Sequence, residues 1–425
     1  MIDSARPASA SARHVLTLMT GTTLAQAIAL AISPILTRLY APEQFGVFAL
    51  YLSIVALLAI VATGRYELAI VLPESDVDAW HLCALALLIA AAVSVSTLLG
   101  VWIFGERIAA RVGDARMADW LFIVPAAVLL TAIVNTFGCW ANRQQRYTQL
   151  ATNRLSQSAT SAAASVGFGA AGQTALGLVW GSVLGFSVST LLFASAMWRD
   201  ARLAIGPVST AAMKAQARRY INFPRINLPH ALLDAAQASA LLAVLGLAFG
   251  GAVLGLYAFA LRIVKTPLGM LGSSVGQVFQ QRAAQVFNEG GDLRGLVERT
   301  TWRLAKIILP FAVLMVFAPP LFALVFGEGW REAGVYALIL APWMALNFIT
   351  SPLSQLPLIV GRQGRAFAYG LAYQASMLLP YVLAWAIKLD IRTALTLQSG
   401  ASSLVLVLYA LWLHSLSRAS GPQHV

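Results

Sequence analysis

The chain has 425 residues, of which 59% are hydrophobic and only 11% are charged, and its formal net charge is +12. An average soluble protein carries about 25% charged residues, so this composition excludes a water-soluble globular fold. The cations do not gather with interleaved aromatic residues on one basic face, as a nucleic-acid groove requires, and we expect no nucleic-acid partner.

Long apolar segments follow one another along the whole chain. Each holds about 20 residues or slightly more, which as a helix crosses the ~30 Å hydrocarbon layer of a bilayer. We therefore predict an all-α integral membrane protein with about twelve transmembrane helices. The spans are expected at residues 15–37, 45–64, 80–104, 118–140, 153–171, 175–197, 228–249, 252–273, 304–326, 334–359, 366–387 and 392–413.

A basic linker separates these spans into two sets of six. Residues 1–198 are expected to form an N-terminal six-helix bundle, and residues 228–425 a C-terminal six-helix bundle with a short cytoplasmic tail. In the linker, residues 199–227, the stretch Ser209–Asn222 is expected to form an amphipathic helix on the inner leaflet, where anionic lipids attract each cation by ~1 kcal/mol. A second such helix, or a solvated connector, is expected from Gly291 toward Lys306.

Most of the 29 lysines and arginines fall in alternate loops between the spans. The positive-inside rule assigns those loops to the cytoplasm and predicts that both termini lie there. Cys83 and Cys139 both fall inside spans toward the cytoplasmic side, where thiols stay reduced, so we expect no disulfide and ordinary apolar packing.

The two halves of the chain carry an internal repeat. Tyr40–Ile54 (YAPEQFGVFALYLSI) aligns with Phe249–Ile263 (FGGAVLGLYAFALRI), which matches Gly46 with Gly255, and farther on RQQR at 143–146 matches RQGR at 362–365. Because six spans are an even number, both halves start from the same side of the membrane. The expected symmetry is a pseudo-two-fold along the membrane normal.

Five ionisable residues are predicted at membrane depth, where charges are costly and mark functional sites. Arg262 and Lys265 lie in the eighth span, Arg65 and Glu67 near the inner end of the second, and Asp234 in the seventh. The cations predict an anion-binding cavity. The alternatives are an ion pair of Arg262 or Lys265 with Asp234, and an Arg65 side chain that extends to the inner headgroups.

Motifs for catalysis are not found. The sequence has no Walker A motif, no dinucleotide fingerprint and no closely spaced set of metal-ligating residues. We therefore expect no enzyme activity, no cofactor, no catalytic residue and no metal site.

Four stretches resemble a known family: Ser33–Leu50 (SPILTRLYAPEQFGVFAL), Gly64–Pro73 (GRYELAIVLP), Phe223–Leu233 (FPRINLPHALL) and Arg299–Leu304 (RTTWRL). They are similar to the O-antigen and lipopolysaccharide-unit flippases of the multidrug/oligosaccharidyl-lipid/polysaccharide exporter superfamily. The resemblance spans essentially the whole chain. It implies two six-helix bundles around a central cavity, in a flippase that moves undecaprenyl-diphosphate-linked oligosaccharides from the inner to the outer leaflet of the bacterial inner membrane.

In such a flippase, Arg262, Lys265 and Arg65 would bind the phosphates, and Glu67 and Asp234 would carry any coupled protons. The expected partners are the lipid-linked oligosaccharide, anionic inner-leaflet lipids and a glycan polymerase or assembly protein. Two alternatives stay open: an ion-coupled exporter of drugs or other small molecules from the same superfamily, and a non-transporting scaffold of a glycan-assembly complex.

Overall fold

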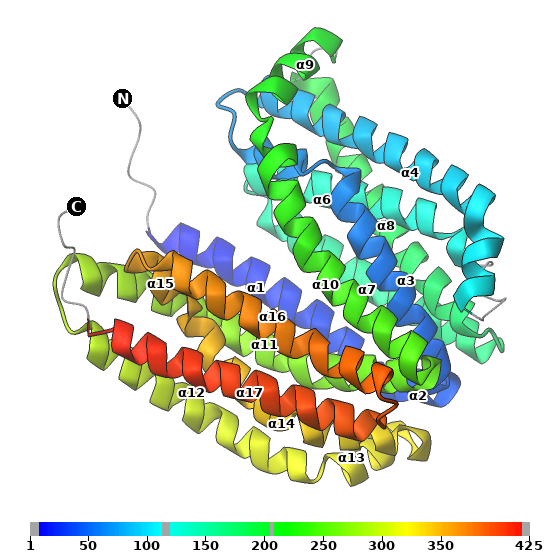
Figure 1. Cartoon of the computed structure of the whole chain (residues 1–425). Helices are drawn as coiled ribbons and strands as arrows, with labels where there is room; N and C mark the ends of the chain where they lie inside the picture. The colour runs from blue at the N-terminus through cyan, green and yellow to red at the C-terminus, as the bar shows by residue number, and fades with distance from the viewer. Residues whose placement is uncertain (1–7, 113–119, 205–207, 419–425) are drawn as a thin grey trace. The chain divides into compact units, whose positions relative to one another are not determined.

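The computed structural model describes residues 8–112, 120–204 and 208–418, with side chains described for residues 20–107, 120–197 and 208–418. All secondary-structure elements of this part of the chain are helices (Figure 1). They divide into two compact units, one formed by residues up to Tyr40 and from Val47 to Leu242, the other by Ala41–Gly46 and Ala243–Val425.

Nine helices of the described residues are long and apolar enough to cross a membrane. The number rises to ten if one pair of helices, bent at a short break, is counted as a single span. The helices α7 (Tyr147–Ala170) and α16 (Gln363–Ala386) coincide with predicted spans but are not among the ten, because polar residues are frequent along both. Each predicted span thus coincides with one helix or with consecutive helical segments, and the all-α membrane fold class is confirmed.

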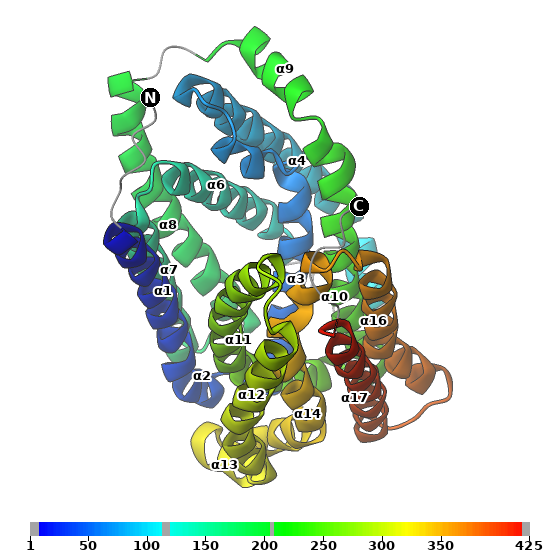
Figure 2. The same ribbon diagram turned by 90° about the vertical axis from the view of Figure 1, so that its left-hand side faces the viewer.

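In the first unit, α7 packs against the neighbouring helices α1 and α8, and α4 packs against α6 (Figure 2). Small residues bring α7 and α8 together: a Cβ on Gly185 would meet Ser161 at 2.9 Å. Such small-residue contacts allow membrane helices to approach closely, since lipid provides no hydrophobic force between them. The helices of this unit are α1 (Ala8–Ala31), α2 (Ser33–Leu39), α3 (Pro42–Ala62), η1 (Tyr66–Val71), α4 (Asp76–Val112), α6 (Val124–Arg143), α7, α8 (Ala175–Ala204), α9 (Thr210–Arg219), η2 (Phe223–Asn227) and the first part of α10 (Leu228–Phe249).

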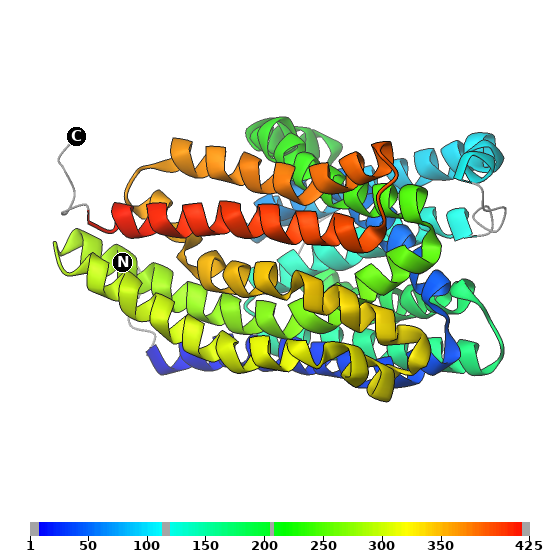
Figure 3. The ribbon, with the colours of Figure 1, turned by 60° about the horizontal axis from the view of Figure 1, so that its bottom comes forward.

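In the second unit, α14 packs against α11, α12, α13 and α17, and α16 lies beside α17 (Figure 3). The first turn of α3 belongs to this unit, and Phe45 packs edge-on against Phe259 and Trp330. The remaining helices are α11 (Gly251–Asn288), α12 (Leu293–Val316), α13 (Ala318–Phe326), η3 (Glu328–Trp330), α14 (Arg331–Thr350), η4 (Ser351–Gln355), α15 (Leu356–Ile359), α16 and α17 (Ile391–Leu416).

The span predicted at residues 304–326 is not one straight helix. The helix α12 ends at Val316, and α13 begins at Ala318 after a bend of 73°. Pro319 and Pro320 explain the break, because proline has no backbone N–H to donate and its ring is accommodated only in the first turn of a helix. At its other end α12 starts at Leu293, so the second predicted surface helix is continuous with the span instead of separate from it.

The linker helix α9 is shorter than predicted and packs against protein. Ser209 caps its N-terminus by accepting a hydrogen bond from the backbone N–H of Ala212. Ala217 and Tyr220 pack against the buried cluster that includes Tyr66 and Leu82. The apolar stripe that was predicted to lie in the inner leaflet is therefore at least partly covered by the first unit.

Candidate functional site

A polar cavity of about 680 Å³ lies in the first unit between η1, α6, α7 and α8. In helices that cross hydrocarbon, a group of polar side chains around one cavity indicates a water-filled site or pathway. Its polar lining residues are Arg65, Glu67, Thr131, Asn135, Asn142, Asn153, Arg154 and Gln157, and Cys139 is also in its wall. We call it the charged cavity.

Arg65 and Glu67 are brought together at the charged cavity by the turn between α3 and η1. Gly64 and Arg65 both have left-handed backbone conformations, with φ of 57° and 63°. This conformation is favourable for Gly64 but uncommon for Arg65. Arg65 donates through Nε to Oδ1 of Asn227 at 3.1 Å and pairs through Nη1 with Oε1 of Glu67 at 3.5 Å.

The carboxyl group of Glu67 is only partly satisfied. The residue is 5% exposed, and its Oε2 atom is buried without a hydrogen-bond partner among the described residues. A buried polar atom left without a partner costs roughly 1–3 kcal/mol. Such an atom at the wall of a cavity indicates that something further binds there, a proton, a water molecule or a ligand.

Helix α7 supplies the opposite wall. Arg154 donates a hydrogen bond to the Thr22 hydroxyl on α1. Asn153, 3% exposed, donates through Nδ2 to Ser189 Oγ on α8 at 2.9 Å, while its Oδ1 atom is buried without a partner in the described part of the chain. The Ser189 contact fixes the orientation of the amide and leaves a second unpaired acceptor beside the cavity.

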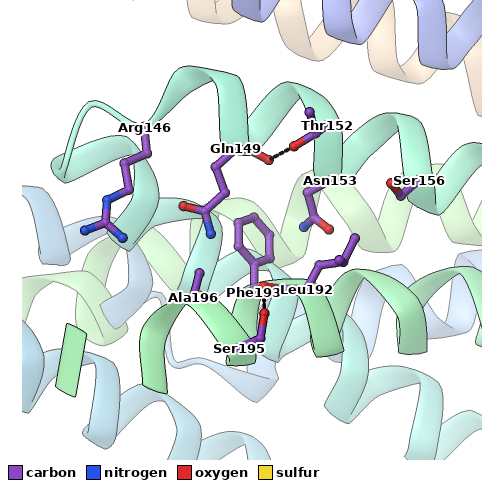
Figure 4. Close-up of a pocket in the computed structure, with 9 residues that line it drawn as sticks. All are labelled: Arg146, Gln149, Thr152, Asn153, Ser156, Leu192, Phe193, Ser195 and Ala196. Carbon is purple, nitrogen blue, oxygen red and sulfur yellow. Dashed lines mark hydrogen bonds between the residues drawn. The ribbon is translucent and has the colours of Figure 1, made fainter. Parts of the chain in front are cut away.

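A second cavity of about 650 Å³ adjoins the first between α7 and α8 and shares Asn153 and Phe193 with it (Figure 4). The amides of Gln149 and Asn153 point toward α8, and the ring of Phe193 points back between them. Arg146, the charged residue of this lining, lies at one end. Because all its other lining residues are uncharged, we call it the neutral cavity.

The edge of the site is held by Arg143 at the end of α6. Its guanidinium donates to the backbone carbonyls of Ile70 and Pro73 at 3.2 and 2.6 Å, and to that of Glu74 at 3.2 Å. It also pairs with Asp76 Oδ1 at 2.8 Å. One planar side chain thus fixes the whole turn from η1 to α4.

Tyr66 ties η1 to the linker helix. Its hydroxyl donates to the Ala217 carbonyl at 3.1 Å, and burial raises the pKa of this hydroxyl. The neutral phenol is the donor that this contact requires.

The other predicted site residues lie elsewhere. Asp234 on α10 pairs with His230 one turn earlier at 3.5 Å, and its side chain is 63% exposed. Arg262 and Lys265 lie on α11 of the second unit, the first half-buried and the second exposed. The structure therefore joins Arg65 with Glu67 in one cavity, and the anion-binding role of Arg262 and Lys265 stays a prediction.

Sequence reasoning missed Asn153, Arg154 and Gln149 as site residues. Part of the signal was present, since Asn153 and Gln157 lie four residues apart in the span predicted at residues 153–171, and Gln149 lies one helical turn before it. Among the described residues, no three His, Cys, Asp or Glu side chains lie close enough together to hold a metal ion.

Solved structures share this fold. The lipid II flippase MurJ in an inward closed conformation gives a TM-score of 0.71 at 11% identity, covering 93% of this chain and 87% of that one. An inward-facing MATE family multidrug resistance transporter of the MOP superfamily gives 0.61 at 14% identity, covering 95% and 96%. A mutant of the Vibrio cholerae MATE transporter VcmN gives 0.59 at 15% identity, covering 95% of each chain.

These likenesses confirm the predicted fold class, and at such identities they concern the fold alone. No curated protein matches the chain. The family described as polysaccharide biosynthesis protein matches residues 35–335, which is well over half of the sequence. The resemblance found in the sequence is thereby confirmed, and the chain belongs to this family of polysaccharide biosynthesis proteins.

Proposed function

We propose that this protein is a flippase that moves undecaprenyl-diphosphate-linked oligosaccharides from the inner to the outer leaflet of the bacterial inner membrane by alternating access, for O-antigen or exopolysaccharide synthesis. The observation that carries the proposal is the charged cavity, which combines Arg65, Arg154 and several amides inside a membrane helix bundle. The family membership of the chain and the fold it shares with a lipid II flippase support the same function.

The chemistry of the cavity suits such a substrate. A lipid-linked diphosphate saccharide has an anionic, strongly hydrated headgroup that cannot enter hydrocarbon unaided. Guanidinium groups bind phosphate oxygens through charge-assisted hydrogen bonds, often two at a time. Arg65 and Arg154 would thus receive the phosphates, and Arg262 and Lys265 of the second unit are the further candidates for phosphate contacts.

Glu67 is the stronger candidate for a proton carrier. It is buried at the cavity wall with one unpaired oxygen and pairs with Arg65 through the other. A phosphate that competes for Arg65 would weaken that pair and favour the protonated carboxyl. Asp234, the second candidate, is largely exposed beside His230.

The cavity is tested with the natural thiol Cys139 in its wall. Cys83 is buried, so Cys83→Ala leaves Cys139 as the reactive cysteine. We expect undecaprenyl diphosphate to slow maleimide labelling of Cys139 in the purified protein, and Arg65→Ala to abolish that protection. Lys388→Ala serves as the control, because it removes a cation of the second unit, between α16 and α17. Equal labelling with and without the lipid would contradict the proposed site.

Transport is tested in the host. Deletion of the gene should leave undecaprenyl-linked saccharide facing the cytoplasm, and a plasmid copy should reverse this. Glu67→Gln on the plasmid should remove any dependence of export on the proton gradient, whereas Glu43→Gln should not. Unchanged lipid-linked pools with intact surface polysaccharide would instead favour the small-molecule exporter.

The expected location has its own test. With both termini in the cytoplasm, a cysteine at Ser209, the N-cap of α9, should label only from the inside. A cysteine at Gly113, which lies outside the described residues, should label only from the outside. Labelling of both from one side would overturn this topology.

We also propose two kinds of partner: anionic lipids at the basic loops on the cytoplasmic side, and a glycan polymerase.

A further inference from the structure

The proposed function leaves the neutral cavity unassigned. It lies next to the charged cavity, and Asn153 and Phe193 stand in the walls of both. A lipid-linked saccharide also has two chemically different parts side by side, an anionic diphosphate and a hydroxyl-rich sugar. The charged cavity suits the diphosphate, and the neutral cavity suits the sugar.

The side chains that point into the neutral cavity are suited to sugar hydroxyls. The amides of Gln149 and Asn153 face α8 from successive turns of α7 (Figure 4). Each amide offers both donors and an acceptor, as hydroxyl groups require. The ring of Phe193 stands between them as an apolar part of the cavity wall.

Asn153 supplies the independent observation. Its amide is held by Ser189 Oγ at 2.9 Å, and Ser189 is itself fully buried. Its Oδ1 atom nevertheless has no partner among the described residues. A buried, oriented acceptor without a partner is costly unless a donor arrives, and a sugar hydroxyl or an N-acetyl N–H is such a donor.

A packing role explains this arrangement less well. Neutral polar residues on membrane helices usually hydrogen-bond across to the neighbouring helix. Asn153 does so with one of its two polar ends, and the amide of Gln149 points into the cavity. Two amides and an aromatic ring around about 650 Å³ of space describe a binding site more closely than a helix contact.

We infer that the neutral cavity between α7 and α8 binds the sugar next to the diphosphate, with Gln149 and Asn153 as the residues that recognise it. This inference rests on the proposed function. It assigns the diphosphate to the charged cavity and the first sugar to the neutral one. It also makes Asn153, which borders both, the residue that senses whether a sugar is attached.

The inference predicts that affinity for sugar and affinity for diphosphate separate on mutation. A site built to hydrogen-bond a substrate hydroxyl discriminates against a ligand that lacks it, because its own polar groups then stay unpaired. Removal of the Gln149 amide should therefore weaken binding of the sugar-bearing lipid and leave binding of the bare lipid diphosphate unchanged.

The experiment measures binding of two probes to the full-length protein in nanodiscs: undecaprenyl diphosphate, and the same lipid carrying one neutral N-acetylhexosamine. Gln149→Leu and Asn153→Leu should each lower affinity for the sugar-bearing probe about tenfold. Gln149, unlike Asn153, does not line the charged cavity, so Gln149→Leu should not change affinity for the bare lipid, and Asn153→Leu should weaken the sugar-bearing probe more than the bare one. Thr148→Val, a polar exposed residue on α7 outside both linings, is the control and should change neither.

The outcomes are distinct. If both variants weaken the two probes equally, or neither probe at all, the sugar subsite is wrong. Since Asn153 also bonds Ser189, Asn153→Leu can fail to fold, and Gln149→Leu then decides alone. If phosphatidylglycerol displaces the sugar-bearing probe and the bare lipid equally well, the cavity is a phospholipid groove and the inference falls. If wild-type protein binds neither probe, the proposed function itself falls.

Discussion

Gly46 and Gly255 approach each other so closely that neither has room for a Cβ atom. A Cβ on Gly255 would lie 2.8 Å from the Gly46 nitrogen, and a Cβ on Gly46 would lie 3.2 Å from the Gly255 nitrogen. The internal repeat predicted from the sequence matches these two glycines with each other.

The first prediction concerns this contact. Gly255→Ala should destabilise the protein by about 1–3 kcal/mol, because its Cβ overlaps the carbonyl of Pro42 and the backbone must move apart. Gly269→Ala on the same helix has open space around it and should be neutral or slightly stabilising. Thermal unfolding in detergent measures both. A similar melting temperature for the two variants would show that the backbones at Gly46 and Gly255 can move apart without loss of stability.

The second prediction concerns Arg143. Arg143→Lys keeps the charge but loses the planar group that reaches Ile70, Pro73 and Asp76 together, so we expect a lower melting temperature and faster proteolysis of the turn between η1 and α4. Arg362→Lys changes the matching, exposed arginine of the second repeat and should have little effect. Equal behaviour of the two lysine variants would mean that the hydrogen bonds of Arg143 add nothing to the turn.

The third prediction concerns the docking of α9. The backbone N–H of Ser209 donates to Nε2 of His81 at 3.2 Å, while Nδ1 of His81 bonds the Val77 carbonyl. His81→Leu removes the acceptor, so α9 should detach more often and trypsin should cleave faster after Lys214.

Inside-out vesicles and a brief trypsin digest measure this effect. His414→Leu is the matched control, because His414 hydrogen-bonds the Ala410 carbonyl within its own helix. If cleavage after Lys214 is unchanged by His81→Leu, the linker helix is held by its apolar contacts alone.

The fourth prediction concerns pH. Asp390 caps α17, and hydrogen bonds from the hydroxyl and the backbone N–H of Thr393 lower the pKa of its carboxyl. Because the folded pKa is the lower one, this cap stabilises the protein fully above the ordinary aspartate pKa, and the stabilisation is lost as pH falls through the folded value. Asp390→Asn retains a capping side chain but should remove this acid-dependent part. Melting temperatures between neutral and acidic pH measure this loss of stability. Parallel curves of melting temperature against pH for the wild-type protein and Asp390→Asn would contradict the prediction.

The helices could be predicted from the sequence because hydrocarbon thickness sets the length of each apolar run. Pro319 and Pro320 could also have predicted the bend at Phe317, but the unbroken apolar run favoured one straight span. The site was harder. Arg65 and Glu67 were predicted from their charge at the end of a span, and the structure places both at one cavity.

Two of the residues that escaped prediction, Gln149 and Asn153, are neutral. They carry no charge that marks them at the start of a predicted span, and their role depends on which helix faces them. The partner of Asp234 was also missed. His230 lies four residues earlier on the same helix, whereas the expected partner was Arg262 or Lys265 of another span. Helical spacing is local information, whereas the walls of a cavity come from segments far apart in the chain.

The first turn of α3 also has a consequence for biosynthesis. Ala41–Gly46 belongs to the same compact unit as α11, which is synthesised about 200 residues later. At translation rates of about 5–20 residues per second, that turn waits roughly 10–40 s in the membrane before its partner helix exists. During this interval the backbone at Gly46 lacks the α11 contact that covers it in the folded chain, so nascent chains halted before α11 should be the ones that membrane chaperones retain and proteases remove.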